Sequence, residues 1–109
     1  MPTVYKVLGQ SNPAATTNTT LYTVPASTSA VVSTITICNQ ASSAATYRIA
    51  VRPAGASIAA QPYVVYGATV AASDTTALTL GVTLATTDVI TVYASTATLS
   101  FNAYGSEIS

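Results

Sequence analysis

The chain contains 109 residues, a length that corresponds to one domain and suffices to bury a hydrophobic core. Half of its residues are hydrophobic, only 6% are charged, and its formal net charge is zero. This composition excludes intrinsic disorder, which combines low hydrophobicity with high net charge, and it offers no basic surface for nucleic acid. The polar surface must therefore consist largely of Ser and Thr side chains, and neutral surfaces of this kind tend to associate.

The first segment, residues 3–8, alternates like a strand and carries Lys6 at its middle. A lysine there is typical either of an edge strand, where it opposes pairing with other sheets, or of a strand face open to solvent. A break at Gly9 and a stretch without pattern at 14–19 come next, so we predict that residues 1–19 form an N-terminal strand plus an extended arm, with a loop at 14–19 as the alternative to the arm. A short strand is then predicted at 20–24.

Residues 31–39 and 45–51 are the most strand-like part of the chain, and we predict that they form a central hairpin joined by a loop at 40–44. Because side chains alternate along a strand, each run has one apolar face. These faces consist of Val31, Ile35, Ile37, Tyr47, Ile49 and Val51. Cys38 lies on the opposite face of its run and is expected to be a small buried thiol.

Further strands are predicted at 63–66, 75–80, 89–94 and 98–104, the last two as a hairpin through 95–97. Gly67 is expected to close the first of these, with 68–72 either prolonging it or forming a separate strand. About eight strands at this spacing predict an all-β fold. We expect residues 1–109 to form a single β-sandwich, Ig-like or jelly-roll-like, of about eight antiparallel strands.

The sequence contains no constellation for catalysis. There is no histidine to act as the base of a Ser-His-Asp triad, and one cysteine gives neither a disulfide nor a zinc site. Asp74 and Asp88 occur at turns, where aspartate caps backbone amides, and Glu107 lies in a C-terminal tail predicted from residue 105. We therefore expect a protein that is not an enzyme and that needs no cofactor and no metal.

Two arginines and two tyrosines are the candidate partner contacts. Arg48 and Arg52 lie on the face opposite Tyr47, about 13 Å apart at the rise of a strand, and they either pair with acidic groups of a partner or are simply solvated. Tyr63 and Tyr66 are predicted to lie on opposite faces of their strand, so that at least one is near the surface. The N-terminus lacks the pattern of a signal peptide, and no apolar run is long enough to cross a membrane, so no membrane partner is expected.

The segments TITICN at 34–39, YRIAVRPAG at 47–55 and LSFNAYGSEI at 99–108 resemble small all-β virion proteins of tailed bacteriophages, including cyanophages. The resemblance implies a structural protein located in the virion. Its first implication is a capsid cement or decoration protein on the major capsid protein, as a homo-oligomer, with a trimer favoured. The alternatives are a tail, neck or fibre component bound to other virion proteins, or an adhesive module that binds host glycans through Tyr and Asn side chains.

Overall fold

A computed structural model describes residues 3–56 and 63–109. The described part contains eight strands and one short 3-10 helix, η1. The strands are β1 (Thr3–Ser11), β2 (Thr19–Thr23), β3 (Ser29–Asn39), β4 (Ala45–Arg52), β5 (Tyr63–Val70), β6 (Thr75–Leu84), β7 (Val89–Ala94) and β8 (Leu99–Ile108), and η1 is Pro53–Gly55. Within these residues, no helix has the length and apolar character needed to cross a bilayer.

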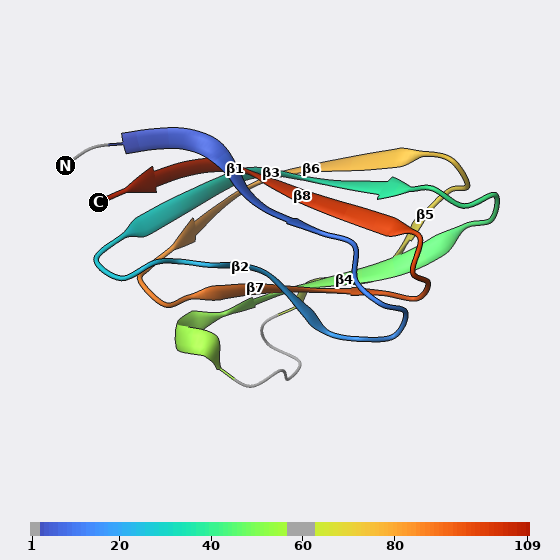
Figure 1. Cartoon of the computed structure of the whole chain (residues 1–109), viewed down its shortest axis with the longest axis horizontal. Helices are drawn as coiled ribbons and strands as arrows, with labels where there is room; N and C mark the ends of the chain where they lie inside the picture. The colour runs from blue at the N-terminus through green and yellow to red at the C-terminus, as the bar shows by residue number, and fades with distance from the viewer. Residues whose placement is uncertain (1–2, 57–62) are drawn as a thin grey trace.

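The strands form two four-stranded antiparallel sheets. The first sheet has the order β1-β8-β3-β6 and the second sheet the order β2-β7-β4-β5. Figure 1 shows the first sheet across the upper part of the view, with β2, β7 and β4 of the second sheet below it. The β-sandwich of eight antiparallel strands predicted from the sequence is confirmed. Most successive strands alternate between the sheets, and the two strand orders are those of a jelly roll rather than an immunoglobulin domain.

The two predicted hairpins are wrong. β3 lies in the first sheet and β4 in the second, and β7 and β8 are separated in the same way. Their connections, residues 40–44 and 95–98, cross between the layers instead of turning back within one. Packed sheets lie only about 10 Å apart, so a connection of this length can do either. In both cases the two apolar faces are buried by facing each other across the sandwich.

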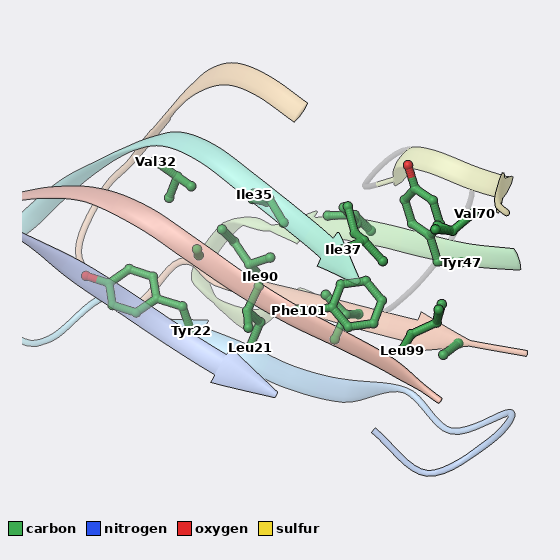
Figure 2. Close-up of a cluster of buried hydrophobic side chains, with 14 of the residues drawn as sticks. Leu21, Tyr22, Val32, Ile35, Ile37, Tyr47, Val70, Ile90, Leu99 and Phe101 are labelled. Atoms are coloured by element: carbon green, nitrogen blue, oxygen red, sulfur yellow. The ribbon is translucent and has the colours of Figure 1, made fainter. Parts of the chain in front are cut away.

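The core lies between the sheets, where the inward side chains of both layers interdigitate (Figure 2). The predicted apolar residues Ile35, Ile37, Tyr47 and Ile49 are buried there. The rings of Tyr47 and Phe101, from opposite sheets, meet edge to face at 6.2 Å between centroids. Such a contact adds to the stabilisation that burial of the two rings provides.

A bulge in β3 changes which of its residues are buried. The pairing of β3 with both neighbours shifts between Val32 and Thr34, so that Ser33 is an extra residue. One extra residue reverses the alternation of faces. Val32 is therefore buried and Val31 lies outward and is only half-buried, which contradicts the prediction that Val31 shares the inner face. Cys38 is on the outer side as predicted, but it is half-buried rather than buried.

The C-terminal segment is not a tail. β8 continues to Ile108 between β1 and β3, so the chain ends beside its own N-terminal strand (Figure 1). Gly105 permits this, because a Cβ at that position would collide with the Val31 carbonyl oxygen. β5 also continues past Gly67, which has a φ of +75° inside the strand rather than closing it.

The N-terminal segment packs on its own sandwich. β1 is an edge strand of the first sheet, the first of the two placements that Lys6 indicated. The loop after β1 is attached to the second sheet, because the Thr16 amide donates a hydrogen bond to the Ala94 carbonyl at 2.8 Å.

One buried polar side chain fastens the end of the sandwich where three loops meet. Asn39 is 1% exposed, and its amide makes hydrogen bonds with all three loops. Its Nδ2 donates to the carbonyls of Ser43, Val70 and Ala71, and its Oδ1 accepts from the Ala41 amide and the Thr98 hydroxyl. These bonds satisfy backbone groups that would otherwise be unpaired where the strands end.

Candidate binding faces

The outer face of the second sheet carries a cluster of one arginine and three tyrosines, which we call the arginine–tyrosine cluster: Arg48, Tyr63, Tyr66 and Tyr93. Arg48 is on the inner strand β4, and it pairs with Tyr66 of β5 on one side and Tyr93 of β7 on the other. Its guanidinium carbon lies 4.3 Å from the Tyr66 ring centroid and 4.2 Å from that of Tyr93. These are cation–π distances, so both rings hold the side chain in place.

Tyr63 and Tyr66 lie on the same face, and the prediction that they lie on opposite faces is wrong. The register of β4 with β5 skips Val64, since Ile49 pairs with Val65 and Ala50 pairs with Tyr63. This irregularity brings the two rings together edge to face, with centroids 4.9 Å apart. Tyr66 is 65% exposed, which agrees with the expectation that at least one of the pair is near the surface.

The two arginines differ in what their donors contact. Arg52 donates to the carbonyls of Gly55 and Ala56 and to the Thr91 hydroxyl, and so fastens the turn that follows β4. Arg48 makes no hydrogen bond and no ion pair with any residue of the described part of the chain. Arg48 therefore lies beside two tyrosine rings with N–H groups that no described residue accepts, whereas Arg52 uses its donors internally.

The outer face of the first sheet, which we call the neutral face, carries no charged side chain in the described strands. Lys6 and Glu107 are the charged residues of this sheet, and both lie in the inward register, where they pair. The outward residues include Tyr5, Val7 and Gln10 on β1; Ser100, Asn102, Tyr104 and Ser106 on β8; Val31, Thr34, Thr36 and Cys38 on β3; and Thr75, Ala77, Thr79 and Thr83 on β6. A shallow hollow lies among Tyr5, Val31 and Tyr104, and Lys6 also lines it. Tyr5 is 84% exposed, so the face has an apolar end that is open to solvent.

Glu107 lies beneath this face in a small polar group. The Tyr22 hydroxyl donates to Glu107 Oε2 at 2.5 Å, and Lys6 Nζ lies 2.9 Å from Glu107 Oε1. The hydrogen bonds from Tyr22 and then from Lys6 lower the pKa of the Glu107 carboxyl. Burial, with the nearby carboxylate, raises the pKa of the Tyr22 phenol. The carboxylate thus joins β1, β2 and β8, a structural role that its place near the chain end did not reveal.

The remaining carboxylates cap backbone amides, as predicted. Asp88 accepts hydrogen bonds from the amides of Ala54 and Ala85, and Asp74 accepts one from Thr75. In residues 3–56 and 63–109, His, Cys, Asp and Glu form no group of three that could hold a metal ion.

The fold and its surfaces define a small jelly-roll domain with one neutral face and one aromatic, cationic face. Comparisons with protein-family models, with curated proteins and with solved structures found no match, so the functional argument depends on these two faces.

Proposed function

We propose that the protein is a structural subunit of a virion: a capsid cement or decoration protein that packs as a homotrimer on the lattice of the major capsid protein. The observation that carries the proposal is the neutral face, because four adjacent strands present no charged side chain on it. Covering such a surface with another subunit leaves no buried charge without a partner, and an unpaired buried charge is a large cost in forming an interface.

The size of the neutral face supports a contact with another protein subunit. Four strands at about 4.8 Å spacing and about 33 Å length give a face of roughly 600 Å². Standard interfaces bury about 800 Å² on each partner. One neutral face therefore provides most of one interface, and side contacts within a trimer would add the remainder.

The fold is suited to this role, since jelly rolls occur in viral capsid proteins as well as in lectins. That support is an analogy at the level of the fold. A tail, neck or fibre component would use the same face, and the number of copies per particle distinguishes the two. Hundreds of copies in purified virions support a capsid cement, and a dozen or fewer support the tail or neck.

The test places charge on one face at a time. Ala77→Lys with Thr79→Lys adds two charges to the neutral face at exposed positions of β6, and Thr23→Lys with Thr69→Lys adds the same number to exposed positions of the second sheet. We expect the first pair to reduce incorporation into particles at least tenfold and the second pair to leave it unchanged. Equal incorporation of both variants would contradict the assignment of the contact to the neutral face.

A further inference from the structure

The arginine–tyrosine cluster lies on the face opposite the proposed contact, and its chemistry is distinct. The rings of Tyr66 and Tyr93 contact the Arg48 guanidinium at cation–π distances, and these contacts provide no hydrogen-bond acceptor for its five N–H donors. Among the described residues no acceptor meets these donors. This arrangement would allow the Arg48 donors to bind a planar acceptor such as a carboxylate.

The cluster is built on sheet strands and so is positioned without a ligand. Arg48 is in the middle of β4 and is half-buried, with a paired strand on each side. Tyr63 braces the Tyr66 ring edge to face. Preorganisation of this kind reduces the rotamer entropy that an arginine loses when it binds.

The local charge favours a single negative group. The strands of the second sheet carry two charged residues in the described part, Arg48 and Arg52, and no acid. The carboxylate of Asp88, beside the turn that follows β4, accepts from two backbone amides, and the donors of Arg52 are used by the same turn. One available guanidinium matches a planar monoanion better than a phosphate, which needs more positive charge around it.

We propose that the arginine–tyrosine cluster is a binding site for a carboxylate group, which Arg48 holds by two parallel hydrogen bonds while Tyr66 and Tyr93 flank the group that bears it. The carboxylate belongs either to an acidic sugar or to an acidic side chain of a peptide. The site does not depend on the proposed virion role, because it uses the other face of the sandwich.

The test is an NMR titration of the ¹⁵N-labelled full chain with 3′-sialyllactose and with the peptide Glu-Ser-Glu-Ser-Glu-Ser. Lactose and the peptide with Gln in place of Glu are the neutral controls. We expect saturable shifts at Arg48, Tyr66 and Tyr93 with at least one acid, weakening as salt is raised. Binding of the sugar alone, of the peptide alone or of both supports the site and identifies the source of the carboxylate.

Variants distinguish the contribution of the Arg48 guanidinium to binding from that of positive charge alone. Arg48→Gln and Arg48→Lys should each weaken binding at least about tenfold, the second because an ammonium cannot form the two-pronged contact. Tyr66→Ala, at an exposed position, should weaken it several-fold, and the matched control Arg52→Gln should not.

Three results would overturn the proposal: no saturation by either acid up to ~10 mM, equal binding of lactose, or binding that survives Arg48→Gln. If Arg48→Gln does not fold, Tyr66→Ala and the map of shifts in the unaltered chain decide the question.

Discussion

Replacement of Asn39 by alanine tests whether one buried amide holds the loops at the end of the sandwich. In Asn39→Ala the Ala41 amide loses its acceptor, and the carbonyls of Ser43 and Val70 lose a donor. Leaving a buried polar group unpaired costs about 1–3 kcal/mol. Since the side chain is 1% exposed, water does not replace these bonds without rearrangement, and we expect a total loss of about 3 kcal/mol.

The assay is thermal unfolding followed by circular dichroism, with urea unfolding as a second measure. For a domain of this size, about 3 kcal/mol lowers Tm by roughly 12–20 °C. The matched control is Asn102→Ala on the neutral face, where the amide oxygen accepts one exposed hydrogen bond from Gln10. The control should lose less than about 1 kcal/mol. If the two variants unfold within a few degrees of each other, Asn39 does not have the role assigned to it.

The remaining predictions concern backbone fit at two glycines and the pH dependence of the C-terminal strand. Gly105→Ala should destabilise the protein by about 3 kcal/mol or more, because the new Cβ would collide with the Val31 carbonyl oxygen. Gly67→Ala has open space around the new Cβ, so it should lose only about 1–2 kcal/mol of stability through backbone strain. Urea midpoints should follow this order, and the reverse order would contradict the assignment. The folded-state pKa of Glu107 is lowered, so its stabilisation is present above the ordinary value of 4.5 and is lost as the pH falls through the folded value. Glu107→Gln should therefore have a flatter Tm profile below pH 4.5, and Tyr22→Phe an intermediate one; identical slopes in all three proteins would refute the coupling.

Alternation of side chains predicted most of the fold. The strands that contain Ile35, Ile37, Tyr47 and Ile49 bury the residues that the period of two assigns to the core. The position of Lys6 indicated an edge strand or a solvent face, and the edge strand is found; a lysine is favoured there because an uncharged edge would be open to pairing. These inferences depend on local sequence alone, and the alternation of a strand is a local property.

The sequence could not assign strands to sheets. Residues 40–44 look like a hairpin turn, yet they cross between the layers, because the two geometries place similar demands on the loop. The bulges at Ser33 and Val64 could not be predicted from the sequence either, since an extra residue is defined only by how its strand pairs with a neighbouring strand. Tyr93 was missed as a member of the cluster for the same reason, because pairing places it beside Arg48.

The candidate residues were found only in part. Arg48 was identified as a candidate partner contact because it lies on the strand face opposite Tyr47. Its environment, however, depends on Tyr66 and Tyr93, which are 18 and 45 residues away in sequence and are placed beside it by strand register. Arg52 was indistinguishable from Arg48 in the sequence pattern, although its donors are used by the turn.

The most direct measurement is a map of the whole particle with this chain located in it. The expected result places the outward residues of β3 and β6, such as Thr36 and Ala77, against a neighbouring subunit, with Tyr66 open to solvent on the other side. A map in which the first sheet faces solvent, or a purified chain that stays monomeric and enters no particle, would contradict the proposal that its uncharged surface exists to be covered.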